Sequence, residues 1–389
     1  MSYRVLMIAP TSFFLDYGCH VRILEEARIL QTMGHRVKIV TYPLGRNLPD
    51  LDIERTMPIP FRSRHETGPS RSKLILDTLL AFKSLTVALA FKPHIIHAHL
   101  HEGALIGGVL SGLLRVPLVF DFQGSLTSEM ADHQFLAARG FLFSLARALE
   151  SWINRLPQKI FTSSENARRL LTHDFTIDES RVMLLHDCVH AETFTQVATD
   201  DLRARLNLPR ERKLVVYIGL LAPYRGTDVL LESARQLFAR GVDAHFIIVG
   251  FPNIEHYQAM ARDLGIDARV NFVGRVPYED VPTWLSLGDV VVEPKMSATE
   301  AAGKVLNYMA IGLPVVAFDI PVMREYLGDL GVYAPLGDAT EFANQIEMLL
   351  NDPARAQELG RALRERVIEK FSWTRAGKEI EKIYSELIK

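Results

Sequence analysis

The chain has no surplus of charge and very little cysteine. Among its 389 residues, 44 Lys and Arg stand against 46 Asp and Glu, which gives a formal net charge of -2. A near-neutral chain offers no bulk basic surface for nucleic acid. The two cysteines, Cys19 and Cys188, are too few for a disulfide framework and are compatible with a reducing compartment. A cytoplasmic globular protein is therefore expected, and 48% hydrophobic residues are enough to build its cores.

Long uninterrupted apolar runs are also missing. The most apolar long stretch, residues 74–91, contains Asp77 and Lys83, so a membrane span is not expected. The opening MSYRVLMIAP fits a first strand better than a signal peptide. The segment at 135–156 is apolar with scattered arginines. It leaves open a peripheral contact with an anionic membrane, although a helix on the face of a domain is the simpler explanation.

Strand and helix patterns alternate along the chain, and the alternation starts twice. The first series of strand patterns lies at 4–10, 36–42, 94–99, 117–122, 159–164 and 182–187, and the second lies at 213–226, 244–250, 270–274, 290–294, 315–319 and 331–335. Continuous apolar strands joined by helices are typical of parallel sheets covered on both faces. The sequence predicts an α/β protein with two doubly wound domains, a long surface loop at 45–72 and a boundary within 190–212.

One polar helix face directly precedes a buried strand in the second half. Within residues 297–319, Glu300, Lys304 and Asn307 are spaced four and three residues apart, so they would share one face of a short helix at 303–311. A glycine and a proline just beyond it are stop signals. A lysine in a first helical turn is unfavourable unless an anion lies nearby. The pattern indicates a phosphate site, and a solvated Glu–Lys pair is the plain alternative.

Two further patterns bear on ligand chemistry. Arg225 and Gly226 open a helix, which places a cation beside free backbone amides and suits a diphosphate, although a surface arginine with a turn glycine gives the same letters. His97, His99 and His101 alternate at strand spacing, but no matching carboxylate–histidine set is visible, so no metal site is predicted. No Gly-x-Gly-x-x-Gly follows either first strand, which argues against a dinucleotide oxidoreductase.

Four stretches together resemble the retaining, nucleotide-sugar-dependent glycosyltransferases of family four: YGCHV…GHRVKIVT, YIGLLAPYRGTDVLLESA, KVLNYMAIGLPVVAFD and FSWTRAGKEIEKIY. The resemblance runs from residue 4 to about 384. It implies the GT-B fold, with two Rossmann-like domains facing a cleft and a C-terminal helix that crosses back. We accordingly expect an acceptor-side domain at 1–195, a donor-binding domain at 196–370 and the returning helix at 371–389. It also implies that no metal or other cofactor is needed.

Of the two cations that the resemblance implies for the diphosphate, this chain keeps one and lacks the other. Where the family often has an arginine after the strand glycine this chain has Leu220, and where it has a lysine before the next glycine this chain has Arg225. Lys304 would then replace the missing cation. Glu300 would hold hydroxyls of the donor sugar, and Asn307, at the place of a second glutamate, would be a weaker ribose contact.

The remaining expected contacts come from both halves. Gly18 and His20 match the family's glycine loop and following histidine, and Gln123 takes the place of a histidine near the transferred sugar. Asp121 is the candidate carboxylate, with Glu300, for a double displacement. Further donor contacts are expected at Gly250, Gly274, Arg275 and Gly303.

The implied reaction moves a sugar, with retention, from a nucleoside diphosphate sugar to a hydroxyl of a glycan, a lipid-linked sugar or a small molecule, as in polysaccharide biosynthesis. Charge builds on the leaving phosphate, so Arg225, Lys304 and nearby amides are expected to lower the barrier. A nucleotide-sugar epimerase, a phosphorylase on the same fold, or a degenerate sugar-nucleotide-binding protein are the alternatives. The last is suggested by Leu220, Gln123 and Asn307. The motifs leave the donor, the acceptor and the oligomeric state open.

Overall fold

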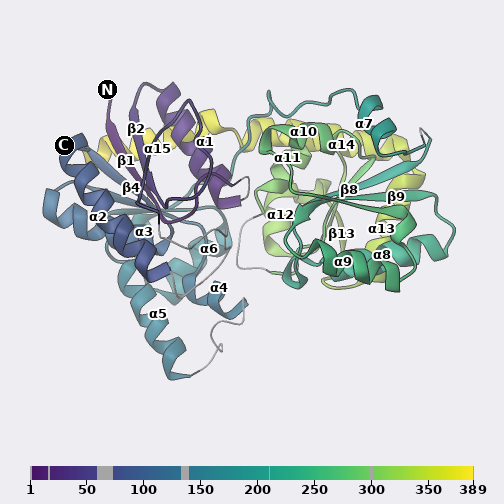
Figure 1. Cartoon of the computed structure of the whole chain (residues 1–389), viewed down its shortest axis with the longest axis horizontal. Helices are drawn as coiled ribbons and strands as arrows, with labels where there is room; N and C mark the ends of the chain where they lie inside the picture. The colour runs from purple at the N-terminus through teal and green to yellow at the C-terminus, as the bar shows by residue number, and fades with distance from the viewer. Residues whose placement is uncertain are drawn as a thin grey trace. The chain divides into compact units, whose positions relative to one another are not determined.

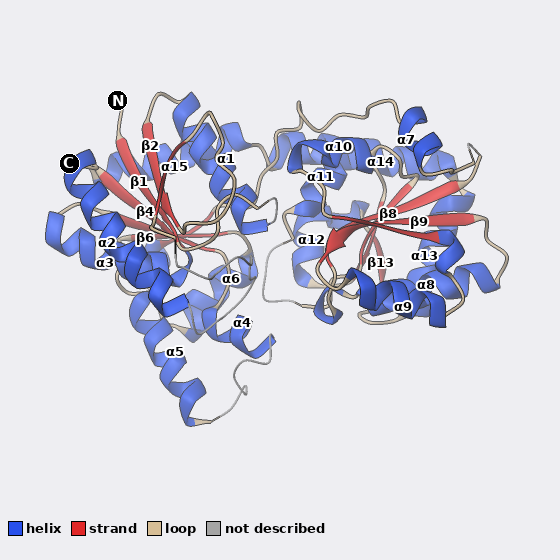
Figure 2. Ribbon diagram, in the orientation of Figure 1, coloured by secondary structure: helices blue, strands red, loops and turns tan. Residues whose placement is uncertain are grey.

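The structure, a computed structural model, describes residues 2–15, 18–58, 73–132, 140–209, 211–297 and 302–388. It divides into two α/β units (Figures 1 and 2). The N-terminal unit takes in Met1–His186 and Trp373–Lys389, and the C-terminal unit takes in Asp187–Ala298 and Ala302–Ser372. The chain therefore leaves the first unit after His186 and returns to it at Trp373.

Seven parallel strands form the sheet of the N-terminal unit, in the order β3-β2-β1-β4-β5-β6-β7. They are β1 (Arg4–Ala9), β2 (Arg36–Thr41), β3 (Asp52–Arg55), β4 (Ile95–His99), β5 (Leu118–Phe122), β6 (Lys159–Thr162) and β7 (Val182–Leu184). The prediction of a continuous loop at 45–72 is wrong at residues 52–55, which form β3. This edge strand pairs with β2, and its Ile53 lies opposite Ile39. Residues 59–72 lie outside the described chain.

Helices cover both faces of this sheet. They are α1 (Gly18–Thr32), α2 (Lys73–Phe91), α3 (Leu100–Leu114), α4 (Leu126–Asp132), α5 (Phe141–Ile153), α6 (Glu165–Arg169) and α15 (Trp373–Leu387), with a π-turn at Leu170–Asp174 and a 3₁₀ turn at Glu179–Arg181. Because parallel crossovers are right-handed, α1 lies on one face and α2, α3 and α5 lie on the other. The C-terminal helix α15 packs along α1 (Figure 1).

The C-terminal unit repeats the plan with six parallel strands in the order β10-β9-β8-β11-β12-β13. They are β8 (Lys213–Leu220), β9 (Ala244–Phe251), β10 (Val270–Gly274), β11 (Val290–Glu293), β12 (Val315–Phe318) and β13 (Val332–Ala334). Its helices are α7 (Asp200–Arg205), α8 (Thr227–Ala239), α9 (Ile254–Asp263), α10 (Val281–Leu285), α11 (Lys304–Ile311), α12 (Pro321–Leu327), α13 (Ala339–Asn351) and α14 (Pro353–Lys370). Short 3₁₀ turns lie at Pro223–Arg225, Asp267–Arg269, Tyr278–Asp280 and Gly328–Leu330.

The predicted α/β class with two doubly wound sheets is confirmed. In each sheet the first strand of the unit is central, because β1 lies between β2 and β4, and β8 lies between β9 and β11. The strand order reverses at these places, and ligands of open parallel sheets bind there, beyond the carboxyl ends of the strands. The apolar middle of each central strand is buried, at residues 5–9 of β1 and 214–217 of β8, as continuous apolar letters require.

Candidate active site

Glycines bring three backbone segments together at the carboxyl end of β8. Gly219 lies opposite Gly250 of β9, and a side chain at Gly250 would overlap the carbonyl oxygen of Gly219. Gly226 has a φ of +73°, and a side chain there would overlap the carbonyl oxygen of Pro294, just after β11. Gly226 and Gly250 therefore require glycine, and main chain rather than side chains lines this strand edge. Gly250 and Gly226, both singled out in the sequence, belong to this edge.

Arg225 enters the edge from the loop between β8 and α8. It ends a 3₁₀ turn, and Gly226, in the left-handed conformation, is the N-cap residue of α8. The guanidinium carbon lies 5.1 Å from the centre of the Tyr224 ring. A permanent cation therefore directly precedes the free amides of a helix N-terminus, as the sequence predicted.

Lys304 is the first residue of α11, which ends at Gly312 in the left-handed conformation. Its ammonium nitrogen lies 2.9 Å from an Oε2 atom of the buried Glu293 and 4.3 Å from the centre of the Tyr217 ring. Burial lowers the pKa of Lys304; the Glu293 carboxylate opposes this shift and the positive charge of Arg225 adds to it. The two cations are thus close enough to interact.

The ammonium of Lys304 also lies against Gly219, where an added side chain would meet it. Gly219 immediately precedes Leu220, the position at which the resemblance implied a missing cation. Lys304 and Leu220 therefore meet at the same strand end. This proximity supports the prediction that Lys304 replaces the lost charge.

Asp187 is a contact of α11 that sequence reasoning did not anticipate. A side chain at Gly303 would come within 2.8 Å of the Asp187 carboxylate, and the hydroxyl of Tyr326 lies 3.4 Å from the same Oδ2 atom. The carboxylate thus lies by the N-terminus of α11, where the helix dipole favours negative charge. The available signal was its place as the last residue of the strand pattern at 182–187, where the carboxyl end of a strand is expected.

The further donor contacts expected at Gly250, Gly274 and Arg275 also lie at strand ends. Gly274 closes β10 with a φ of +88°, and the exposed Arg275 follows it. The Arg275 guanidinium carbon lies 3.8 Å from the centre of the Phe251 ring, at the end of β9 and next to Gly250. An arginine stacked on an aromatic ring presents a flat cationic platform. Phe251 was not singled out from the sequence.

Two predicted sugar contacts have different outcomes. Glu300 lies outside the described residues, so its role stays a prediction. Asn307 lies on α11, three residues after Lys304 and partly exposed. The shared helix face is thus present for Lys304 and Asn307.

In the N-terminal unit, Gly18 begins α1 and has open space around its Cα atom. His20 is fully buried. Its Nδ1 atom accepts a hydrogen bond from the amide of Leu15 at 2.8 Å, and its Nε2 atom contacts the hydroxyl of Thr11. Both ring nitrogens of His20 therefore hold the loop that leads into α1. The predicted donor contacts of Gly18 and His20 stay predictions.

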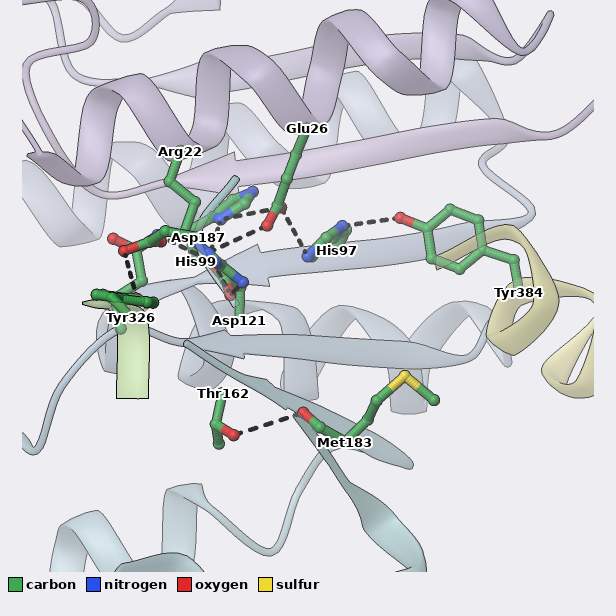
Figure 3. A network of polar contacts seen from close by, with 11 residues as sticks. Arg22, Glu26, His97, His99, Asp121, Thr162, Met183, Asp187, Tyr326 and Tyr384 are labelled. Atoms are coloured by element: carbon green, nitrogen blue, oxygen red, sulfur yellow. Dashed lines mark hydrogen bonds and ion pairs between the residues drawn. The ribbon is translucent and has the colours of Figure 1, made fainter. Parts of the chain in front are cut away.

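Asp121 is fully buried at the end of β5 and is held from three sides (Figure 3). Arg22 of α1 donates to both carboxylate oxygens at 2.7–3.0 Å, His99 lies 3.2 Å away, and the amide of Gln123 donates at 2.8 Å. Burial by itself would raise the pKa of Asp121, but the Arg22 charge and the His99 contact hold it below its usual value. Such a carboxylate is poorly placed as a nucleophile. It fixes the side chain of Gln123 instead.

The same network continues behind Asp121 (Figure 3). Glu26 of α1 lies 3.1 Å from Arg22 and 3.4 Å from His97, and His97 shares a 2.7 Å hydrogen bond with the Tyr384 hydroxyl of α15. One ligand atom each from Glu26, His97 and His99 lie within 4.8 Å of one another, close enough to hold a metal ion. The Arg22 guanidinium already supplies positive charge there, and the expected absence of a metal stays a prediction.

Arg22 and Glu26 were missed from the sequence. The signal was an arginine and a glutamate four residues apart on the face of α1 that also carries Ile23, Leu30 and other buried residues. Charged groups in such a face need partners from another element. Here the partners come from β4 and β5.

Two Rossmann-like units in one chain, one with a cationic, glycine-lined strand edge, fit a nucleotide-sugar-dependent glycosyltransferase of the GT-B fold. Comparison with known proteins agrees. Residues 17–188 match the model of the glycosyl transferase 4-like domain, and residues 198–366 match that of the glycosyl transferases group 1. The chain belongs to this glycosyltransferase family.

Individual relatives are distant but cover nearly the whole chain. The D-inositol 3-phosphate glycosyltransferase of Corynebacterium diphtheriae is 26% identical over 95% of this chain and 90% of its own. Sucrose-phosphate synthase from Thermosynechococcus elongatus superposes with a TM-score of 0.84, at 20% identity and 99% coverage of both chains. The Anabaena protein HepE, solved with UDP and glucose, gives 0.80 at 16% identity, over 99% of this chain and 100% of its own. The two solved structures support the GT-B fold.

Proposed function

We propose that this glycosyltransferase acts with retention, taking a sugar from a nucleoside diphosphate sugar bound by the C-terminal unit and adding it to an acceptor hydroxyl. The observation that carries the proposal is the arrangement of Lys304 at the end of β8. Its ammonium pairs with Glu293 and lies against Gly219, and the charge of Arg225 lowers its pKa. Two cations beside glycine-lined main chain would stabilise the charge of a leaving diphosphate.

Arg225 and Lys304 are proposed to bind different phosphates of the donor. Arg225 and the first amides of α8 would hold one phosphate, and Lys304 would hold the other. Glu293 keeps Lys304 protonated although burial favours its neutral form. As the sugar–phosphate bond breaks, negative charge grows on oxygens that already face fixed positive groups, so the barrier falls. These cations supply the charge that a metal ion would otherwise provide, and no cofactor is proposed.

The proton of the acceptor hydroxyl needs a destination. The burial of Asp121 and its bidentate contact with Arg22 disfavour a covalent intermediate on that carboxylate. We therefore favour a front-face reaction, in which the leaving phosphate accepts this proton and the acceptor joins the same face of the sugar. The Arg275–Phe251 platform is the proposed contact of the base. HepE was solved with UDP, so UDP-sugars are the first donors to test.

Substitution of Lys304 tests the diphosphate contact. A hydrogen bond to a charged group contributes about 1.5–3 kcal/mol, so Lys304→Ala should weaken nucleoside diphosphate binding about 10- to 100-fold in calorimetric titration. Lys213→Ala is the matched control, because Lys213 lies at the opposite end of β8 and pairs with Asp289 at 3.1 Å. Unchanged affinity in Lys304→Ala would remove Lys304 from the donor site.

The stereochemical proposal has its own test. A thermal-shift screen over nucleotide sugars identifies the donor, because a ligand at 100 times its dissociation constant stabilises by about 2.7 kcal/mol. NMR of the product then reads the anomeric configuration before it equilibrates. The configuration of the donor should persist. The opposite anomer would refute retention, and tight donor binding without turnover in an acceptor pool would favour the degenerate binding protein.

A further inference from the structure

The outer surfaces of α2, α3 and α5 expose an unusual number of large apolar side chains. Leu74 and Phe82 of α2 are 76% and 67% exposed, Leu113 of α3 is 63% exposed, and Phe141 and Trp152 of α5 are 81% and 52% exposed. The helix α3 packs against both α2 and α5, so the three lie side by side (Figures 1 and 2). We call the exposed residues of these three helices the apolar face.

Charge is excluded from this face. Every exposed residue of α2, α3 and α5 is apolar, glycine, serine or threonine. The charged side chains of these helices lie to the side or inside, where Lys83 pairs with Glu54 at 2.6 Å and Arg147 pairs with Asp174 at 3.1 Å. In the C-terminal unit, by contrast, the exposed surface of α14 carries Arg, Glu and Lys side chains. A surface helix normally turns its polar side to water.

The composition of α2 indicates which environment suits the apolar face. By length and composition alone it is the one helix among the described residues that could cross a membrane. Its inner side, however, packs on the sheet through residues such as Leu80 and Val87, so it cannot leave the unit without exposing the core. An apolar helix held in place in this way is suited to lie against a bilayer surface and not to span it.

Basic residues border the face on one edge. The loops that follow α2, α3 and α5, at residues 92–94, 115–117 and 154–158, carry Lys92, Arg115 and Arg155 and no acidic residue. All three side chains are exposed. Helices of a doubly wound sheet run antiparallel to its strands, so these three loops lie together at the amino edge of the sheet. That charge is complementary to anionic lipid headgroups.

We propose that the apolar face is a docking surface for an anionic lipid bilayer. The side chains of Phe82, Leu113, Leu145 and Trp152 enter the boundary between headgroups and acyl chains, while Lys92 and Arg115 contact the headgroups. This inference goes beyond the proposed sugar transfer, because no step of that reaction depends on these residues. It also places the protein at a membrane surface.

Flotation with lipid vesicles tests the docking surface. The intact protein should float with vesicles of phosphatidylcholine containing phosphatidylglycerol, and binding should fall about tenfold or more when salt is raised or when phosphatidylglycerol is omitted. The double variant Leu145→Ser, Trp152→Ser and the double variant Lys92→Glu, Arg115→Glu should each lower binding at least tenfold. All four side chains are exposed, so these variants should keep the unfolding temperature of the native protein.

The control is Ile368→Ser, which removes a 52%-exposed apolar residue from α14 of the C-terminal unit and should leave flotation unchanged. Absence of flotation at low salt, or equal loss in the control, would overturn the proposal. So would a dimer in light scattering that Leu145→Ser, Trp152→Ser abolishes without any effect on lipid binding, because a second copy would then cover the face. Donor binding, measured in parallel, reports separately on the proposed function.

Discussion

At the scale of single residues, glycines allow backbone segments to approach closely at the carboxyl edge of the C-terminal sheet. Lys304 shows how a local rule can be satisfied in more than one way. Its place in the first turn of α11 indicated a nearby anion, and Glu293 supplies one within the chain. The unfavourable place of a lysine in a first helical turn therefore does not by itself require a phosphate. The stronger indication is the position of the ammonium against Gly219 and near Arg225.

Gly226→Ala should destabilise the C-terminal unit by about 2–4 kcal/mol, because it adds left-handed strain to an overlap with the carbonyl of Pro294. Gly241→Ala separates the two causes, since Gly241 has a φ of +83° with nothing within 4 Å of the added atom. The control should cost only about 1 kcal/mol. Urea unfolding of both variants measures the difference, and equal losses would mean that the contact with Pro294 does not constrain the loop.

At the scale of elements, α2 combines a sheet-packing side and an exposed apolar side, with the charged residues Asp77 and Lys83 between them. Asp77 and Lys83 argued against a membrane span, and the structure gives each a partner in the N-terminal unit. The Tyr42 hydroxyl hydrogen-bonds Asp77, and Glu54 of β3 pairs with Lys83. Burial raises the pKa of Asp77 to about 6, against the lowering effect of the Tyr42 hydrogen bond.

Asp77→Asn should therefore change how stability depends on pH. A carboxyl whose folded pKa is raised binds more protons in the folded state, so stability falls as pH rises from about 4 to about 6 and stays low above that. The asparagine cannot ionise, and it should raise the stability of the N-terminal unit at pH 7.5 by about 1–2 kcal/mol after allowance for solvent screening. Little change is expected at pH 4.

Denaturant unfolding at both pH values measures this effect. Asp263→Asn, at the exposed end of α9, is the matched control. A stabilisation by Asp77→Asn that is the same at pH 4 and pH 7.5 would contradict the raised pKa of Asp77.

At the scale of the whole molecule, the last helix belongs to the first unit. The amide of Val189 donates to the carbonyl of Phe371 at 2.9 Å. The segment that leaves the N-terminal unit after His186 therefore lies beside the segment that returns to it at Trp373. Beyond them, α15 buries Trp373, Ile380 and Tyr384 in the N-terminal unit. The stability of that unit therefore depends on residues about 190 positions beyond its last strand, β7.

Deletion of residues 373–389 should destabilise only the N-terminal unit. Amide exchange in β1 and β4 should accelerate strongly, while exchange in β8 and β11 should stay unchanged, because α15 packs on α1 and contacts His97. Tyr384→Phe is the milder variant and should cost about 1 kcal/mol through one lost hydrogen bond. Faster exchange in both sheets to the same extent would show that α15 does not stabilise the N-terminal unit selectively.

Much of the fold follows from the sequence because its strands are continuous apolar runs. Each of the twelve strand patterns overlaps an observed strand, and the start and stop of α11 agree with the Gly303 and Gly312 signals to within one residue. The strand β3 was missed because its letters, DIER, are mostly charged and its pairing with β2 is visible only in three dimensions. Edge strands lack the two-sided burial that produces an apolar run.

The sequence by itself determined the class, the family resemblance and the positions of Arg225, Gly226 and Lys304 at helix starts, because these depend on local letters. Only the tertiary structure decided their partners. Arg22 and Asp121 are 99 residues apart in the chain and meet because α1 and β5 pack in one unit. Glu293 reaches Lys304 because β11 lies beside β8. Long-range contacts between charged groups follow strand order and burial, and neither is visible in the spacing of residues along the chain.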